Sequence, residues 1–324
     1  MSNEPVLTPS VDSSEGILVD WLELVAFFNE FGIARLDALV SSLDQQEEED
    51  ADFGTKDKRE DELREKIGNE IAFREADCEG AYPFEHSEDG EELRLKDNWR
   101  DEQYAFYLTC LLTSHLTASQ ILEKTVHPDL ISRLRNRVFQ VVSVFAMAGL
   151  AQGPAASVGW PRESKEAIIA VLKRAEERGA GIRPRTEAGE YTRPREKDGG
   201  IDVMSWTNDN RLPPALLYYA QVASGANWHG KPVITFVETF EDNYLDLKPR
   251  GNRGYATLIP YRETDFVQWF HEHSVHKLLL DRTRIPKHGW AGVVLSRSGI
   301  HMDEAANLPQ VTTWVENMRE SLLA

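Results

Sequence analysis

Cysteine is scarce in this sequence, and so are features that would place the chain in a membrane. The 324 residues include two cysteines, Cys78 and Cys110, which exclude a disulfide framework and a CxxC zinc knuckle. Sparse cysteine is typical of the reducing cytosol. The first residues are polar and acidic, and the longest apolar stretch, residues 138–150, is too short to cross a bilayer. We therefore expect a cytoplasmic protein with no membrane segment.

Basic residues are also in deficit. The chain has 36 Lys and Arg against 54 Asp and Glu, a net charge of −18, which argues against a general nucleic-acid coat protein. The excess is confined to residues 1–150, where 14 basic side chains face 32 acidic ones, whereas residues 151–324 contain 22 of each. This asymmetry predicts two domains, the first an acidic domain that binds a protein partner or regulates the second.

The first 150 residues are predicted to be mostly helical. Apolar residues recur at helical spacing in the segments 17–31, 34–43, 61–76, 100–116 and 118–149, the last broken near Pro128. The acidic run from Gln45 to Asp52 has two interpretations. It is either a solvated linker or helix face, or an acidic surface that mimics DNA or docks a partner.

The pattern changes after Gly149, where glycine and proline residues mark a boundary. An amphipathic helix is predicted at 163–178. Strands are predicted at 201–206, 215–223 and 254–260, with a fourth candidate at 290–296, and helices at 264–280 and 311–322. Phe266, Trp269 and Phe270 fit core packing. The fold class is therefore α+β, with a mostly helical N-terminal domain followed by an α/β domain.

Two predicted strands place a carboxylate opposite an amide. Residues 201–206 and 215–223 flank an eight-residue loop, TNDNRLPP, and in an antiparallel hairpin centred on it positions that sum to about 423 face each other. Asp202 and Gln221 meet this condition, so we expect them at cross-strand range on rigid strands. Aspartate is depleted in strands and costly when buried without a partner. The alternative interpretation is an aspartate capped by backbone N–H groups and a glutamine on the solvated face.

Other candidate sites in the sequence have weaker support. His271, His273 and His276 lie on one predicted helix, but their spacing does not place all three on one face, which argues against a zinc site. Asp281 is expected to pair with Arg282 or Arg284 in a structural role. No GKS or GKT tripeptide occurs, so a Walker A phosphate loop is excluded.

The segment DGGID, from Asp198 to Asp202, together with Gln221 resembles the core of the PD-(D/E)xK nuclease superfamily in its Mrr-like restriction-endonuclease branch. There, a GGxD strand is followed by a strand that carries QxK instead of ExK. The resemblance covers about residues 160–300 and implies that residues 151–324 form a restriction-endonuclease-like domain with a central mixed sheet. The chain departs from the pattern at Ala223, where the family has lysine, and Lys231 is the candidate replacement, with Lys197 in reserve.

The resemblance implies a DNA endonuclease that depends on Mg²⁺ or Mn²⁺. Its expected metal ligands are Asp202 and Gln221, with Glu166 from the preceding helix as a third. Lys231 is expected beside the attacking water. Basic side chains are expected to contact DNA phosphates, and the candidates are Arg193, Arg195, Lys197 and Arg250.

Mrr-like nuclease domains often act against foreign DNA, so the resemblance further implies the nuclease subunit of a bacterial anti-phage defence system. Ala223 leaves a second interpretation open. In that interpretation the protein is a catalytically inactive nuclease-fold subunit of such a system, which binds DNA or protein. Homo-oligomers are compatible with both.

Overall fold

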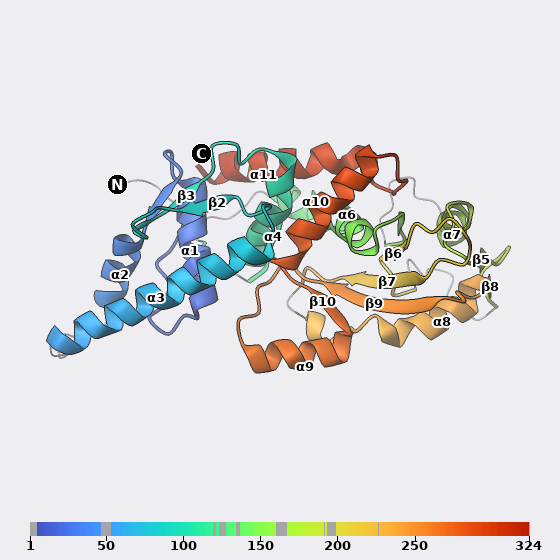
Figure 1. Cartoon of the computed structure of the whole chain (residues 1–324), viewed down its shortest axis with the longest axis horizontal. Helices are drawn as coiled ribbons and strands as arrows, with labels where there is room; N and C mark the ends of the chain where they lie inside the picture. The colour runs from blue at the N-terminus through green and yellow to red at the C-terminus, as the bar shows by residue number, and fades with distance from the viewer. Residues whose placement is uncertain are drawn as a thin grey trace.

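The computed structural model shows an α+β protein in which a helical part lies beside a layered unit built on a central sheet (Figure 1). It describes residues 5–46, 53–118, 121–122, 128–133, 137–159, 167–190, 192, 199–225 and 227–323. No helix in these ranges is long and apolar enough to cross a bilayer.

The N-terminal part combines helices with a small sheet. Its elements are α1 (Glu15–Phe28), β1 (Ile33–Arg35), α2 (Leu36–Asp44), α3 (Phe53–Asp77), β2 (Phe84–His86), β3 (Glu92–Leu95), α4 (Glu102–Ala118), α5 (Pro128–Arg133) and α6 (Phe139–Ala151). β3 lies between β1 and β2 and pairs with both in antiparallel fashion. Helices predominate in this part, as predicted, but the small sheet was not predicted, because strands of three or four residues are too short to show alternation in the sequence.

The C-terminal part alternates strands and helices. Its elements are β4 (Ala155–Ser157), α7 (Ile168–Glu177), β5 (Arg183–Pro184), β6 (Val203–Trp206), β7 (Leu216–Val222), η2 (Trp228–Gly230), α8 (Ile234–Tyr244), β8 (Leu245–Leu247), β9 (Asn252–Leu258), α9 (Phe266–His276), β10 (Leu278–Leu280), α10 (Arg284–Arg297), η3 (Ala305–Asn307) and α11 (Leu308–Leu323).

Three predicted strands are confirmed by β6, β7 and β9, and the fourth candidate at 290–296 is wrong. The β-branched residues of that segment favour a strand by composition, but it lies inside α10. Gly292 brings α10 onto α6, since a Cβ at this position would lie 2.1 Å from the carbonyl oxygen of Phe145. Close helix packing therefore decides the structure of this segment.

The central sheet has five strands in the order β10–β9–β7–β6–β4. β4, β6 and β7 pair antiparallel, whereas β7, β9 and β10 pair parallel, so the sheet is mixed, as expected. Side chains alternate between its faces. Val203 and Ala220 pack in the core shared with α6, and Met204 and Tyr219 pack in the core shared with α7 and α8. Figure 1 shows α6 and α10 on one side of the sheet and α8 and α9 on the other.

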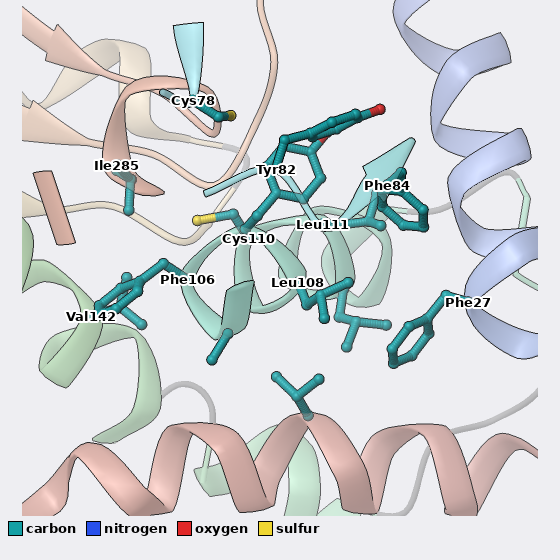
Figure 2. Close-up of a cluster of buried hydrophobic side chains, with 14 of the residues drawn as sticks. Phe27, Cys78, Tyr82, Phe84, Phe106, Leu108, Cys110, Leu111, Val142 and Ile285 are labelled. Carbon is teal, nitrogen blue, oxygen red and sulfur yellow. The ribbon is translucent and has the colours of Figure 1, made fainter. Parts of the chain in front are cut away.

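The larger hydrophobic core contains residues from both sides of residue 150. In Figure 2, Phe106 of α4 lies near Val142 of α6 and Ile285 of α10. Both cysteines, Cys78 and Cys110, are buried in this core, and burial raises the pKa of each thiol. The predicted domain boundary near residue 150 therefore does not coincide with a break in the core.

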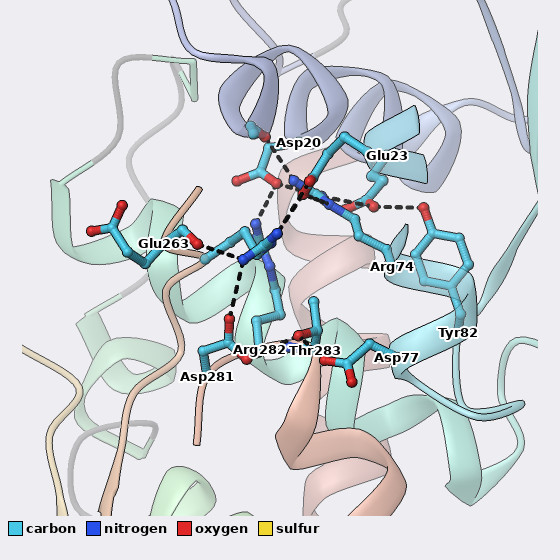
Figure 3. Close-up of polar contacts among 12 residues, drawn as sticks. Asp20, Glu23, Arg74, Asp77, Tyr82, Glu263, Asp281, Arg282 and Thr283 are labelled. Carbon is cyan, nitrogen blue, oxygen red and sulfur yellow. Dashed lines mark hydrogen bonds and ion pairs between the residues drawn. The ribbon is translucent and has the colours of Figure 1, made fainter. Parts of the chain in front are cut away.

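A buried ionic network joins the N-terminal helices to the end of β10 (Figure 3). Arg74 of α3 donates to Asp20 at 2.7 Å and to Glu23 at 2.9 Å, both on α1. Arg282, two residues after β10, also donates to Asp20. Burial opposes ionisation of Asp20, but Arg282, Arg74 and His115 outweigh it and hold the pKa of that carboxyl well below its usual range. The network ties α1 and α3 to the edge strand of the central sheet.

Asp281 is buried and bonded within the fold, but its ion-pair partner is Arg262, and the expected Arg284 contacts it through the backbone. Its Oδ1 accepts hydrogen bonds from the Thr283 hydroxyl at 2.9 Å and from the backbone N–H of Arg284 at 3.2 Å. Its other carboxylate oxygen, Oδ2, forms an ion pair with Nη1 of Arg262 at 3.6 Å. Burial raises the pKa of Asp281 against these interactions.

The aromatic residues of α9 are not core residues as a group. Trp269 packs against a small apolar cluster at the sheet edge, whereas Phe266 and Phe270 are 72% and 60% exposed. The expectation of core packing is wrong for these two phenylalanines because α9 turns a different face inward. That buried face carries the polar residues Glu272 and His276.

Candidate functional site

The β6–β7 hairpin has the predicted register. Val203 is paired with Ala220 and Met204 with Tyr219, and these positions sum to 423 as predicted. The strand pairing ends at Val203, and the backbone N–H of Asp202 donates at 2.9 Å to the carbonyl of Ala220, one residue before Gln221. Asp202 therefore lies just outside β6, beside β7, and its position opposite Gln221 on one face of the sheet stays a prediction.

Asp202 combines the two interpretations that the sequence leaves open. One carboxylate oxygen, Oδ2, accepts a hydrogen bond from the backbone N–H of Val222 at 2.8 Å, which is the backbone capping of the alternative interpretation. The other, Oδ1, lies towards Gly159. A Cβ at Gly159 would lie 2.8 Å from it, so glycine leaves space beside this oxygen.

Gln221 carries an unsatisfied acceptor. Its side-chain oxygen Oε1 is buried and has no hydrogen-bond partner among the described residues. A buried polar atom without a partner costs about 1–3 kcal/mol, so such atoms in folded proteins call for an explanation. A cation or an ordered water at this point would satisfy it.

Gln140 is a component of the site that the sequence did not predict. It lies on α6, and its Nε2 donates to the carbonyl oxygen of Asp202 at 2.9 Å and to the hydroxyl of Ser157 at 3.1 Å. Its Oε1 would be 3.1 Å from a Cβ at Gly159, the same point that Asp202 Oδ1 approaches. The one signal in the sequence is a glutamine inside the largely apolar stretch 138–150, whose other polar side chain is Ser143.

The glycines of the DGGID segment have a structural reason. Gly199 and Gly200 have positive φ angles of 62° and 82°, a conformation that favours glycine. A Cβ on Gly200 would lie 2.5 Å from the ring of Phe236 on α8. The two glycines therefore permit the turn before β6 and the close approach of α8 to the start of the candidate site.

No lysine in the described part of the chain contacts the candidate site in the way that the family's motif lysine would. Ala223 packs against a small apolar cluster that includes Trp228. Lys231 is exposed just after η2, three residues before α8 begins, and no ion pair joins its ammonium group to a described residue of the site. Its role beside the site stays a prediction.

The other predicted site residues are divided between undescribed and distant positions. Glu166, Arg193, Arg195 and Lys197 lie outside the described residues. Arg250 is exposed just before β9, at the end of the strand away from Gln221. At 3.3 Å per residue that end of β9 is roughly 17 Å from the Gln221 position. A contact between Arg250 and DNA, if it forms, is therefore made away from the candidate ligands.

A polar chain continues from the hairpin into α9. Thr257 on β9 is the register partner of Gln221, and its hydroxyl lies 2.8 Å from Nδ1 of His276. Nε2 of His276 is 3.4 Å from Glu272, which lies 2.7 Å from Nδ1 of His229. Burial lowers the pKa of His276 against the attraction of Glu272. Glu272 and His276 share the buried face of α9 at i,i+4 spacing, and the spacing of His271, His273 and His276 considered alone did not reveal this pair.

The oxygen chemistry of these side chains suits a hard divalent cation. Carboxylate and carboxamide oxygens, such as those of Asp202, Gln140 and Gln221, are ligands of the kind that Mg²⁺ and Mn²⁺ prefer, and such ions keep several waters. Asp202 Oδ1 and Gln140 Oε1 both approach the Gly159 position, whereas Gln221 Oε1 lies on the neighbouring strand β7. A cluster of three or more His, Cys, Asp or Glu with metal-binding geometry does not occur within the described ranges. In comparisons with known proteins, no family model, no curated protein and no solved structure matches this chain.

Proposed function

We propose that this protein is a DNA endonuclease that depends on Mg²⁺ or Mn²⁺ and that its metal is held by Asp202 and Gln221. The observation that supports this most directly is the buried, unsatisfied Oε1 of Gln221, next in the chain to Val222, whose backbone N–H donates to the Asp202 carboxylate. The DGGID segment that resembles Mrr-like nucleases leads into this strand pair, and α7 and α8 flank it.

Each residue has a part in this chemistry. When bound, the metal neutralises charge that develops on the phosphate and activates water. Asp202 supplies the negative charge that attracts the ion, and the hydrogen bond from Val222 N–H to Oδ2 fixes the direction of Oδ1. Gln221 offers its neutral side-chain oxygen Oε1, which has no hydrogen-bond partner among the described residues. Gln221 lies within β7 and the Asp202 carboxylate is bonded to the same strand, and a rigid support of this kind lowers the cost of assembling a site.

A second function is favoured by one observation. Ala223 stands where the family pattern has lysine, and the described residues supply one carboxylate to the site. A site of this charge binds a cation more weakly than one with two carboxylates. The second candidate is therefore a nuclease-fold subunit that binds DNA or protein without cleaving it.

The test is cleavage of supercoiled plasmid by the full-length protein with Mg²⁺ or Mn²⁺. Asp202→Asn is expected to lower the rate at least about 100-fold, the scale of losing one preorganised charged group in an active site. Asp246→Asn is the matched control, because Asp246 is exposed on β8 away from the hairpin. Equal cleavage by the wild type and Asp202→Asn, or no cleavage by either, would overturn the proposal.

Binding measurements distinguish the second candidate. Calorimetry with Mn²⁺ and fluorescence anisotropy with a DNA duplex are carried out on the same three proteins. DNA binding without cleavage, unchanged in Asp202→Asn, is the expected result for the non-catalytic subunit. A role in anti-phage defence and a protein partner for the acidic first 150 residues belong to the same proposal, and loss of phage protection on deletion of the gene tests the former.

A further inference from the structure

The polar chain beside the hairpin ends in an imidazole at the surface. Glu272 of α9 is buried, and its Oε1 contacts Nδ1 of His229 at 2.7 Å and Nε2 of Gln268 at 2.5 Å. The His229 side chain is 51% exposed, and its ring stacks on Trp228 with centroids 3.8 Å apart. His229 is therefore held from two sides while part of its ring faces solvent.

The contact with Glu272 decides which nitrogen of His229 carries the proton. An ionised carboxylate only accepts hydrogen bonds, so the ring nitrogen that faces it must donate. Nδ1 is thus protonated in neutral His229, and Nε2 keeps its lone pair on the outward side. A buried carboxylate that orients an imidazole in this way is a recurrent arrangement for proton transfer in enzymes.

The second carboxylate oxygen of Glu272 also has a partner. Its Oε2 lies 3.4 Å from Nε2 of the fully buried His276. Nδ1 of that ring lies 2.8 Å from the hydroxyl of Thr257, whose strand partner is Gln221. Contacts from side chain to side chain therefore link the exposed imidazole to the strand position next to a candidate metal ligand.

The pair formed by His229 and Glu272 also lies next to position 223, where the family pattern has lysine. Ala223 directly follows β7, and its backbone N–H continues the pairing to β9 by donating to the carbonyl of Leu258 at 2.9 Å. Because side chains alternate along extended backbone, Ala223 is placed on the face of Gln221, two residues earlier. Ala223 packs against the cluster that contains Trp228, and the ring of Trp228 in turn supports His229. The side chain of Trp228 thus lies beside Ala223, and the imidazole of His229 is stacked on that indole.

We propose that His229, oriented by Glu272, is the proton acceptor of this site and takes the part of the lysine absent at position 223. The inference rests on the proposed nuclease function. As the oxygen of water bonds to phosphorus, one proton of that water passes to Nε2 of His229. The P–O bond to the leaving oxygen breaks with its electron pair, this oxygen takes a proton from solvent, and the imidazolium then releases its proton to solvent.

The experiment compares full-length wild type with His229→Gln, Glu272→Gln and His271→Gln. The last is the control, because His271 is exposed on the outer face of α9 and its side chain makes no described contact. His229→Gln is expected to reduce plasmid cleavage about 100-fold or more, the usual contribution of a general base. Glu272→Gln is expected to reduce it less, and His271→Gln to leave it unchanged.

Two further measurements separate a proton acceptor from a structural residue. The titratable groups that face His229 are Glu272 and, beyond it, His276 of α9, and Lys231 follows on its own segment. Part of the pH dependence of cleavage by the wild type is expected to require the imidazole, and this pH limb is expected to disappear in His229→Gln. Imidazole added to that variant is expected to restore part of the rate.

The tautomer gives a readout that does not need activity. In ¹⁵N NMR spectra of the wild type, His229 is expected to be protonated at Nδ1, and Glu272→Gln is expected to change that preference. The inference is overturned if the wild type cleaves and His229→Gln cleaves equally well, if its pH limb survives, if imidazole fails to restore activity, or if Nε2 carries the proton. Absence of cleavage by the wild type would instead overturn the nuclease function on which it rests.

Discussion

Replacement of Arg74 by methionine is expected to be among the most destabilising single changes in this protein. The guanidinium is fully buried and bonds to Asp20 at 2.7 Å, to Glu23 at 2.9 Å and to Glu70 at 2.8 Å. Its Nη2 also donates to the carbonyl oxygen of Gly16 at 2.9 Å. Methionine fills most of the volume and removes every donor.

The magnitude follows from the groups that remain. Asp20 keeps a cation in Arg282, whereas Glu23 keeps only the hydroxyls of Tyr82 and Tyr107 among its described partners. Glu23 is completely buried. Removal of one partner from a buried ion pair costs about 3–5 kcal/mol, because the other charge is left without compensation. We expect a loss in this range in the free energy of unfolding.

Urea unfolding at pH 7, followed by tryptophan fluorescence, measures this loss against Arg64→Met. Arg64 lies on the same helix and also contacts three carboxylates, but in a partly exposed cluster with Asp37, Glu60 and Glu91. Exposed ion pairs contribute about 0–1 kcal/mol, so the control should lose at most about 1 kcal/mol. A loss for Arg74→Met no larger than for Arg64→Met would refute the reasoning.

The same network predicts how stability depends on pH. Because Arg282 and Arg74 lower the folded pKa of Asp20 despite its burial, the ionised carboxyl stabilises the fold above its unfolded pKa of about 3.9. That contribution is lost as the pH falls from about 4 towards the folded pKa. In Arg74→Met the folded pKa rises, so acid unfolding should begin at a higher pH. An unchanged acid midpoint, measured by circular dichroism, would contradict this account.

Three further outcomes are expected. Gly149→Ala should destabilise the fold by about 2 kcal/mol or more, because its Cβ would lie 1.9 Å from the carbonyl oxygen of His288. Gly68→Ala, whose Cβ would meet nothing within 4 Å, should stabilise the fold by about 0.5–1 kcal/mol. Urea unfolding compares the free energies of unfolding of the two variants. Cys110 should react with a thiol reagent only as fast as the protein opens, because burial raises its pKa, and rapid labelling of the native state would contradict this. Phe266→Ser should change stability by less than about 0.5 kcal/mol, since the ring is exposed, and a calorimetric loss near 3 kcal/mol would restore the core interpretation.

The hairpin was predictable because its geometry is local. An eight-residue loop between two apolar segments places the midpoint of the chain reversal, and the register of β6 against β7, from Val203 opposite Ala220 to Trp206 opposite Leu217, follows from counting residues outwards. A strand periodicity of two then determines which of these residues share a face. Neither step needs information from distant segments.

The rest of the site was not predictable for the opposite reason. Gln140 bonds to Asp202 across 62 residues, and His229 contacts Glu272 across 43. α8 was missed altogether, because its first turns, from Ile234 to Val237, are rich in β-branched and aromatic residues that favour strands. Burial of Phe240 and Tyr244 in the core under the sheet outweighs this local preference.

The ion pairs give the charge asymmetry of the sequence a second explanation. Carboxylates from before residue 150 pair with basic side chains from after it: Asp20 with Arg282, Glu70 with Arg262, Asp77 with Lys287 and Glu102 with Arg297. Paired carboxylates add little to the field that an outside partner meets. Part of the acidic excess of the first 150 residues is therefore neutralised within the molecule by the second half. The charges of the two halves are in this respect complementary. The ion pairs between the packed halves therefore explain part of the charge asymmetry, beside any role of the acidic half in binding a partner.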